Sequence, residues 1–327
     1  MDELQIKTKV IGVDITLEYT TCAVVDIRGT IIGKERFATS DYPNVNNYVT
    51  VLCEKIVTLA ENNGGYESIR SVGISAPSSN FKTGCIENAA NLPWKGVVPL
   101  AAMLRDRLGM AVALGNDGHV SALGEFTYGS AHGMQNFIVM TFNQDGVGSC
   151  IFANGVPHLG IDGFAGEVGH TCVEEDGRLC GCGKRGCLER YVSATGMVQT
   201  AKELMAASDE PSLMRSIDQL NLQSIALCCR QGDKLALETI HRTAEVLGVS
   251  LANYASILNP EAIILSGDVK LVAEWLIGRT REVLDANVFH NLKGKVRLLT
   301  SIVDAEERTI LGASALAWGV KEYSLFK

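Results

Sequence analysis

The chain has 327 residues, of which 46% are hydrophobic, 6% aromatic and 20% charged. This length and composition are typical of a soluble globular protein with room for two domains of ordinary size. The formal net charge of -8 argues against a nucleic-acid-binding surface, because such a surface needs concentrated basic residues.

No segment of the sequence predicts export or membrane insertion. The first residues lack a basic start followed by a long apolar run, and no later stretch is apolar over a spanning length. We therefore expect a cytoplasmic protein that binds neither nucleic acid nor membrane. The ten cysteines are then expected as reduced thiols, because disulfides persist mainly in oxidising compartments.

The first part of the chain predicts strands with helices between them. Three β-rich runs, 10–15, 20–27 and 29–38, are separated by polar or glycine turns, which predicts an antiparallel meander. Apolar residues then recur every three or four positions, which predicts a helix. The predicted helix covers 45–63. After it we expect a strand at 68–77, a helix at 99–109, and a strand that ends in a polar loop at 111–118.

The second part begins in the same way. Runs 136–142 and 148–155 are strand-like around a glycine turn. The strand–turn–strand pattern that begins the first part thus recurs, which indicates a duplicated lobe. The clearest helix is predicted before Pro260, with one long apolar stripe. This helix is expected over 234–258. Two strands are expected over 261–267 and 296–303, and a closing helix over 307–318.

The segment GEVGHTCVEEDGRLCGCGKRGCLE, residues 166–189, concentrates side chains that bind metals. Cys180, Cys182 and Cys187 alternate with glycines, which permit tight turns that aim several thiolates at one point. His170 completes a Cys3His set, which is typical of a closed, structural zinc site. Two alternatives stay open: Cys172 as a competing ligand, or reduced surface cysteines on a glycine loop. The remaining cysteines are expected in the core: Cys22, Cys53, Cys85, Cys150, Cys228 and Cys229.

Five motifs in order resemble the ROK family, named for repressors, open reading frames and sugar kinases. They are GVD, NLPW, NDG, GEVGH and CGCGKRGCLE, at 12–14, 91–94, 116–118, 166–170 and 180–189. The resemblance implies an α/β protein with the two-lobed actin-like ATPase (ribonuclease H-like) fold and an interlobe cleft. We expect a small lobe of residues 1–118 plus 305–327, and a larger lobe, 119–304, that carries the zinc loop.

The same resemblance implies ATP-dependent phosphorylation of a hexose or N-acetylhexosamine, at C6 by family analogy. A carboxylate must accept the proton of the attacking hydroxyl, and Asp117 holds the position of the family's general base. Taken alone, Asn-Asp-Gly is more typical of a turn whose aspartate bonds its own backbone. The positions that bind sugar hydroxyls in the family are here Asn91, Asn116, Glu167, His170 and Glu189.

These polar side chains suit a sugar, because a pocket built for hydroxyls rejects ligands that lack them. His170 has two ring nitrogens, so it could serve zinc with one and the sugar or a second partner with the other. Solvated loop charge is the alternative interpretation of Glu167 and Glu189. If Glu167 and Glu189 instead bind the sugar, the zinc clip holds both glutamates in place as one wall of the pocket.

The nucleotide side departs from the family pattern. Loops that are usually Gly-Gly-Thr, Leu-Gly-Thr-Gly and Gly-Gly-Gly read here TLEY, NQDG and LSGD, at 16–19, 143–146 and 265–268. One unpaired carboxylate about 5 Å from a phosphate charge costs about 3 kcal/mol at an effective dielectric near 20. Mg²⁺ bound by Asp14, Glu18 or Asp145 would reverse that effect. The candidate contacts for ATP are Asp14, Thr16, Asp145, Gly146 and Gly267.

Two functions of different class follow. One is an ATP-dependent sugar kinase with Mg²⁺; the other is a sugar-binding sensor or scaffold whose ATP loops have degenerated. The repressor branch of the family carries a helix-turn-helix before the first strand, and with only about eight residues there, no DNA-binding domain is expected. Because relatives are commonly dimers, a homodimer is expected.

Overall fold

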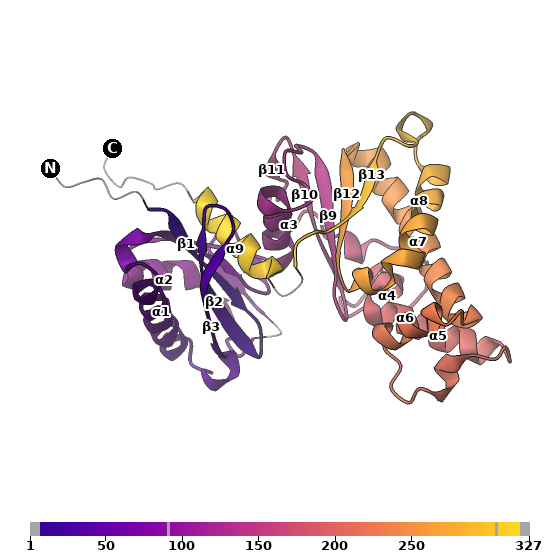
Figure 1. Cartoon of the computed structure of the whole chain (residues 1–327), viewed down its shortest axis with the longest axis horizontal. Coiled ribbons are helices and arrows are strands. Elements are labelled where there is room, and N and C mark those ends of the chain that lie inside the picture. Colours follow the sequence, from indigo (N-terminus) through magenta and orange to yellow (C-terminus); the bar gives the residue numbers. More distant parts are fainter. Residues whose placement is uncertain (1–6, 90–91, 305–306, 321–327) are drawn as a thin grey trace. The chain divides into compact units, whose positions relative to one another are not determined.

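The computed structural model describes residues 7–89, 92–304 and 307–320. The chain divides into two compact units, the first formed by Met1–His132 with Val303–Lys327 and the second by Gly133–Ile302. Each unit has its own mixed sheet covered by helices (Figure 1).

The sheet of the first unit has the order β3-β2-β1-β4-β8. Strands β1, β2 and β3 pair antiparallel, which confirms the predicted meander, and β4 and β8 continue the sheet in parallel with β1. The strands are β1 (Lys9–Ile15), β2 (Tyr19–Asp26), β3 (Ile31–Ala38), β4 (Ile69–Ser75) and β8 (Ala111–Gly115). A small antiparallel sheet adds β5 (Ser79–Asn80), β6 (Cys85–Glu87) and β7 (Val97–Val98).

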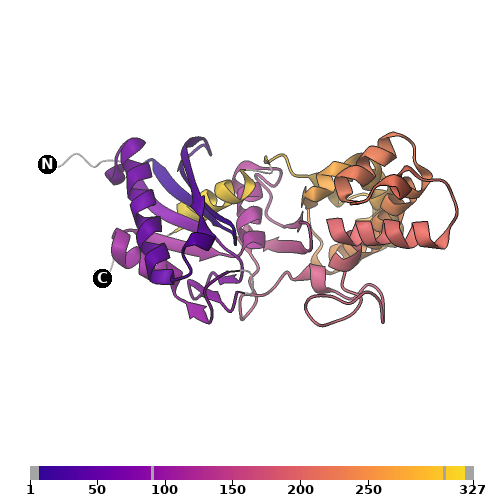
Figure 2. The ribbon, with the colours of Figure 1, turned by 90° about the horizontal axis from the view of Figure 1, so that it is seen from below.

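Helices α1 (Val45–Asn62) and α2 (Leu100–Leu108) cover one face of this sheet, and α9 (Arg308–Gly319) covers the other (Figures 1 and 2). Side chains of β1 alternate between the two faces: Ile11 packs on the α1 side and Val10 on the α9 side. Helix α9 lies against the strand backbone, because a Cβ on Gly73 would be 2.0 Å from the carbonyl oxygen of Ala313. This close approach fixes the middle of α9 against the sheet.

The sheet of the second unit has the order β11-β10-β9-β12-β13. Again an antiparallel meander is followed by two parallel strands, so the sheet repeats the topology of the first unit and agrees with the predicted duplication. The strands are β9 (Phe137–Phe142), β10 (Val147–Ala153), β11 (Val156–Pro157), β12 (Ala262–Gly267) and β13 (Arg297–Thr300).

The core of the second unit is formed where helices pack on this sheet. Its buried side chains include Met140 of β9, Leu265 of β12 and Leu251 of the long helix. The predicted long helix is confirmed as α7 (Lys234–Leu258), which ends at Asn259 in the left-handed conformation before Pro260. The other helices, which the sequence did not predict, are α4 (Glu189–Val192), α5 (Ala194–Ala207), α6 (Leu222–Arg230) and α8 (Ala273–Asn287).

Helix α3 (Asp117–Tyr128) replaces the polar loop that the sequence suggested after β8. It belongs to the first unit because it packs along α9, where a Cβ on Gly124 would lie 3.2 Å from the backbone of Gly312. The boundary between the units therefore falls after His132, whereas the sequence analysis placed it after Gly118. The chain returns to the first unit at Val303, whereas the sequence analysis placed that return at residue 305.

Four of the six cysteines expected in the core are buried, and Cys53 and Cys85 are half-buried. All ten cysteines are free thiols. Among the described residues, no helix combines the length and the apolar composition needed to cross a bilayer.

Candidate functional site

The carboxyl ends of three neighbouring parallel strands bring two aspartates together in the first unit. Asp14 of β1 is the register partner of Ser75 on β4, and Ser75 is the register partner of Gly115 on β8. Asn116 and Asp117 follow Gly115 directly. Because the three strand ends lie at one level, Asp14 and Asp117 share the same edge of the sheet.

Asn116 and Asp117 form the start of α3. Asn116 is the N-cap, and its Oδ1 accepts a hydrogen bond of 2.9 Å from the backbone N–H of Gly118. Asp117 is the first helical residue, and its Oδ1 accepts from the same N–H at 2.9 Å. The Asn-Asp-Gly sequence therefore starts a helix, since an asparagine cap and an acidic residue in the first turn both favour a helix N-terminus.

The two aspartates hold their protons more strongly than usual. Burial of the carboxyl, and secondarily the charge of Asp117, raise the pKa of Asp14 to about 6. Loss of water around its carboxyl also raises the pKa of Asp117, although part of that residue stays exposed. Arg308 at the start of α9 opposes both shifts, and Thr309 lowers the pKa of Asp14. Sequence analysis missed Arg308 and Thr309, whose positions depend on how α9 packs.

The turn between β1 and β2 is closed by its own residues. The backbone N–H and the hydroxyl of Thr16 both donate to the carbonyl oxygen of Tyr19, at 2.9 Å each, and Tyr19 N–H donates back to the hydroxyl at 3.1 Å. Leu17 and Glu18 are exposed at its tip. Thr16, a candidate contact for phosphate, thus uses its hydroxyl within the turn.

In the second unit, the corresponding turn joins β9 to β10. The backbone N–H of Asn143 donates to Gly146 at 3.0 Å, and Asp145 between them is exposed. The turn rests on the start of α5, where Thr195 N–H donates to the carbonyl oxygen of Gln144 at 2.9 Å. Gly267 at the end of β12 is the register partner of Phe142, the residue before this turn. The candidate ATP contacts Asp145, Gly146 and Gly267 therefore occupy one edge of the second sheet.

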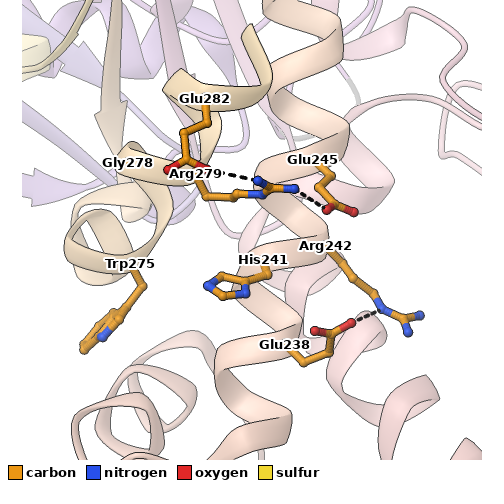
Figure 3. A pocket seen from close by; sticks show the side chains of 8 residues that line it. All are labelled: Glu238, His241, Arg242, Glu245, Trp275, Gly278, Arg279 and Glu282. Atoms are coloured by element: carbon orange, nitrogen blue, oxygen red, sulfur yellow. Dashed lines mark hydrogen bonds and ion pairs between the residues drawn. The ribbon is translucent and has the colours of Figure 1, made fainter. Parts of the chain in front are cut away.

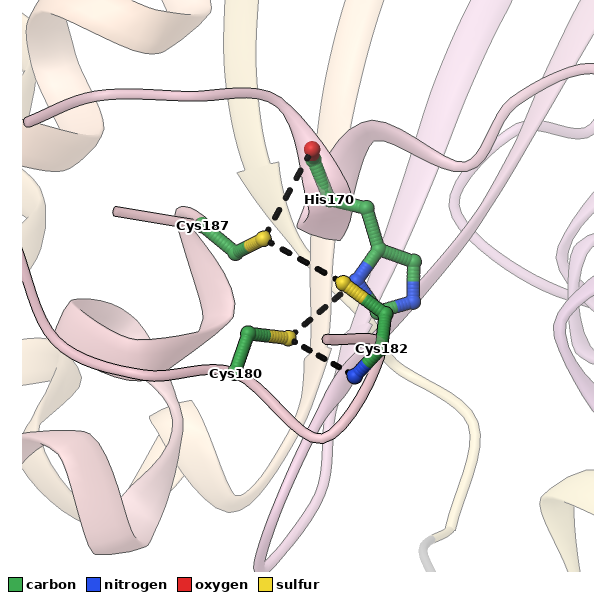
Figure 4. A group of neighbouring side chains, drawn as sticks. All are labelled: His170, Cys180, Cys182 and Cys187. Atoms are coloured by element: carbon green, nitrogen blue, oxygen red, sulfur yellow. Dashed lines mark hydrogen bonds between the residues drawn. The ribbon is translucent and has the colours of Figure 1, made fainter. Parts of the chain in front are cut away.

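His170, Cys180, Cys182 and Cys187 come together as predicted, with one potential ligand atom from each lying within 4.8 Å of all the others. Figure 4 shows the three sulfur atoms and the His170 ring turned toward one another. Cys180 Sγ is 3.7 Å from His170 Nδ1, and Cys182 Sγ is 3.6 Å from Cys187 Sγ. A zinc ion with Zn–S bonds of about 2.3 Å separates tetrahedral thiolates by about 3.8 Å, so the donor set fits zinc.

The cluster thiols differ in their environment. Burial raises the pKa of Cys180 and of Cys187, whereas the backbone N–H of Lys184 lowers the pKa of the exposed Cys182. Cys172, the alternative ligand, is exposed and does not belong to the cluster.

Glu189 connects this cluster to the β9–β10 turn. It is the first residue of α4, its side chain is 12% exposed, and Cys180 Sγ donates to its Oε1 at 3.0 Å. Its Oε2 faces Gly146, where a Cβ would lie 3.3 Å away. Glu167 is exposed and immediately precedes the short 3-10 helix that carries His170. The cluster and the two glutamates are thus parts of one local structure.

Arg178 fastens the cluster loop to the helices behind it. Its guanidinium donates to the carbonyl oxygens of Arg190 at 2.7 Å and Gly196 at 3.0 Å, to the Thr200 hydroxyl at 2.8 Å and to Glu203 at 2.6 Å. Sequence analysis missed this residue because every partner lies at least twelve positions away along the chain.

Asn91, a candidate sugar contact, lies outside the described residues. A surface groove of about 500 Å³ between α7 and α8 contains none of the predicted site residues. Figure 3 shows its charges paired with one another: Arg242 with Glu238, and Arg279 with Glu245 and Glu282. This groove therefore offers little that would recognise a neutral sugar.

Comparison with known proteins agrees with the predicted resemblance. The ROK family model matches residues 10–320. The glucokinase of Thermotoga maritima is 31% identical over 314 residues, which cover 95% of this chain and 97% of that protein. The xylose repressor of Caldicellulosiruptor bescii is 27% identical, and the match covers 94% of this chain and 77% of the repressor.

Among solved structures, the ROK family glucokinase from Streptomyces griseus in complex with glucose and AMPPNP matches with a TM-score of 0.75. Its sequence is 29% identical, and the match covers 95% of this chain and 99% of that one. The two units, each with the same five-stranded topology, are those of an actin-like ATPase fold. The chain belongs to the ROK family.

Proposed function

We propose that this protein is a sugar kinase that transfers the γ-phosphoryl group of MgATP to a hydroxyl of a hexose or N-acetylhexosamine, at C6. The observation that carries the proposal is the placement of Asp14 and Asp117 at one edge of the first sheet by the register of β1, β4 and β8. The Thermotoga maritima relative named glucokinase, similar over 95% of this chain, supports the same chemistry.

Asp117 is the proposed general base. It accepts the proton of the sugar hydroxyl as the hydroxyl oxygen attacks the γ-phosphorus and ADP leaves. A base works best when its pKa lies near the working pH, so the raised pKa of Asp117 suits this role. The start of a helix also holds the carboxylate in one position, through its bond to Gly118 N–H.

The sugar is proposed to bind Asn91 and Asn116 of the first unit and Glu167, His170 and Glu189 of the second. Each offers oxygen or nitrogen atoms that match hydroxyl groups, and each would leave an unpaired polar group if the hydroxyl were missing. Glu189 is the best supported of these, because its carboxylate is largely buried beside the cluster and its Oε2 faces the β9–β10 turn at Gly146.

Zinc is proposed in the cluster of His170, Cys180, Cys182 and Cys187. Four such ligands close the coordination shell, so the metal would cross-link the loop and supply no reactive water. Its contribution is to hold the loop that carries Glu189. His170 would use Nδ1 for the metal, because this nitrogen faces Cys180.

ATP is proposed to contact Asp14 and Thr16 in the first unit and Asp145, Gly146 and Gly267 in the second. Asp14, with a pKa near 6, is ionised at neutral pH and is suited to bind Mg²⁺ directly or through water. Mg²⁺ would offset the repulsion between phosphate groups and the carboxylates of Glu18 and Asp145.

The alternative is a sugar-binding protein that no longer transfers phosphate efficiently. The observation that favours it is the β1–β2 turn: the Thr16 hydroxyl is committed to Tyr19, and Glu18 is exposed beside it. Loops that bind phosphate instead present backbone N–H groups and small residues.

One experiment separates the two functions. ADP release is measured over a panel of glucose, N-acetylglucosamine, N-acetylmannosamine, allose and fructose, and calorimetry measures the binding of each sugar and of MgATP. The kinase requires both binding events and turnover with at least one sugar. Sugar binding with no affinity for MgATP would overturn the kinase proposal and leave the sensor.

A homodimer and a cytoplasmic location, both expectations from the sequence analysis, are further parts of the proposal. Sedimentation of the purified protein tests the dimer.

A further inference from the structure

Cys172 lies directly opposite Cys187 across an antiparallel bridge. The flanking hydrogen bonds run from Leu188 N–H to Thr171, at 2.9 Å, and from Val173 N–H to Gly186, at 2.8 Å. Because the bonds are made by the residues on either side, Cys172 and Cys187 are a non-hydrogen-bonded pair. Such pairs have Cα atoms about 4.5 Å apart and side chains on the same face.

That spacing falls within the range of about 4.4–6.8 Å in which a disulfide closes without backbone movement. Cys172 Sγ already lies over the neighbouring residue, 3.3 Å from where a Cβ on Gly186 would be. Gly186 has a φ of 73°, a conformation that favours glycine, and a Cβ there would lie only 1.7 Å from the carbonyl oxygen of Glu174.

Both sides of the bridge are held firmly. The hydroxyl of Thr171, next to Cys172, lies 2.5 Å from the hydroxyl of Tyr254 on α7 and donates to Val168 at 2.8 Å. Cys187 is fully buried and lies two residues before Glu189, the first residue of α4. Cys172 by contrast is exposed. An oxidant in solution therefore reaches Cys172 before Cys187, and the thiol opposite it across the bridge is a member of the metal-binding cluster.

We propose that Cys172 is an oxidation site whose thiol forms a disulfide with Cys187 and so removes one ligand from the Cys3His cluster. A peroxide oxidises the Cys172 thiol to a sulfenic acid, and its O–O bond breaks with release of one water. The thiolate of Cys187, having given its proton to solvent, then attacks the Cys172 sulfur; the S–S bond forms, and the hydroxide that leaves takes up a proton to become a second water. Two thiols are oxidised and one peroxide is reduced.

This inference goes beyond the proposed kinase. The disulfide itself requires neither sugar nor ATP, and its effect on the metal rests on the proposed zinc cluster. Three remaining ligands no longer close a tetrahedral site, so zinc affinity falls, and reduction of the disulfide by a dithiol restores the cluster.

The test uses the full-length protein loaded with Zn²⁺, without sugar or nucleotide. After treatment with hydrogen peroxide and alkylation, trypsin cuts at Arg178, Lys184 and Arg190, and a glutamate-specific protease cuts after Glu167. These cuts place Cys172, the Cys180–Cys182 pair, Cys187 and Cys150 on separate peptides. Mass spectrometry without reduction then identifies each cross-link, and a chromogenic chelator follows zinc release.

We expect the Cys172–Cys187 peptide pair to accumulate together with released zinc, and both to reverse with dithiothreitol and added Zn²⁺. Cys172→Ser should lose the cross-link and keep its zinc under the same treatment, whereas Cys85→Ser, at a half-buried cysteine outside the cluster, should behave as the unaltered protein. Cross-links confined to Cys180, Cys182 and Cys187, or equally fast zinc release from Cys172→Ser, would overturn the inference. If the protein takes up no Zn²⁺, the same peptide mapping decides whether the disulfide forms.

Discussion

Sγ of Cys180 lies 3.0 Å from Oε1 of Glu189, so a proposed metal ligand directly contacts a proposed sugar ligand. The other oxygen of Glu189 faces Gly146 of the β9–β10 turn. A single largely buried carboxylate thus lies between the metal-binding loop and the turn expected near phosphate. Any change in the cluster must therefore alter the surroundings of Glu189.

Removal of the metal is expected to weaken sugar binding. Without the ion, the loop that carries the three cysteines loses its cross-link, and Glu189 loses a fixed orientation. We expect one zinc per chain in the purified protein, and a fall in sugar affinity after chelation of about 10–100-fold, the same order as the loss of activity when residues that support a metal site are mutated. Elemental analysis and calorimetry measure the two quantities. A zinc content near zero with full sugar binding would contradict this role.

Glu189→Gln is expected to reduce sugar affinity with little change in MgATP affinity. The substitution keeps the shape but removes the charge, and hydrogen bonds to charged groups contribute about 1.5–3 kcal/mol, or roughly 10–100-fold in affinity. Glu175→Gln, at an exposed position of the same loop, is the matched control and should bind sugar normally. Equal affinities for the two variants would remove Glu189 from the proposed site.

Asp14→Asn is expected to stabilise the protein at neutral pH while it abolishes turnover. In the unfolded chain the carboxyl ionises near its ordinary pKa of 3.8, whereas in the folded protein it retains its proton up to about pH 6. As pH rises between these values, the unfolded chain loses its proton first, so the free energy of unfolding falls, by at most about 3 kcal/mol.

The asparagine variant lacks this loss. Its gain in the free energy of unfolding should be present at pH 7.5 and much smaller near pH 4, as measured by urea unfolding of the first unit. Asp106→Asn, at an exposed residue, is the control and should show no such difference. If Asp14→Asn lowered the free energy of unfolding at both pH values, burial of the ionised Asp14 carboxylate would not be what destabilises the folded protein at neutral pH.

Arg178→Ala is expected to destabilise the cluster loop strongly. Its side chain is only 10% exposed and satisfies two backbone carbonyl oxygens, Thr200 and Glu203. Removing a buried cation from such a network costs about 2–4 kcal/mol. Arg242→Ala, which breaks an exposed ion pair on α7, should cost less than about 0.5 kcal/mol. If thermal unfolding showed comparable losses of stability for Arg178→Ala and Arg242→Ala, Arg178 would not anchor the loop.

The sequence predicted local features well where the information is local. The β-rich runs became the two meanders, the apolar stripe before Pro260 became α7, and the spacing of Cys180, Cys182 and Cys187 identified the cluster with His170. These patterns depend on neighbours within a few residues.

Other features depend on packing between distant segments. The pairing of Asp14 with Ser75, and the position of Arg308 beside both aspartates, require the register of the sheet and the approach of α9. The sequence predicts a polar loop where α3 starts, because Asn-Asp-Gly is typical of a turn although its asparagine also suits a helix N-cap. The network of Arg178 joins residues from three helical or loop segments, which no short motif records.

Phosphoryl transfer by Asp117→Asn tests the central proposal most directly. Calorimetry first establishes that the variant binds sugar and MgATP as the unaltered protein does, and a coupled assay then follows ADP release. Loss of a general base should reduce kcat by about 10²–10⁴-fold while both affinities persist. An unaltered protein that turns over a sugar, paired with an Asp117→Asn variant of equal kcat, would contradict the assignment.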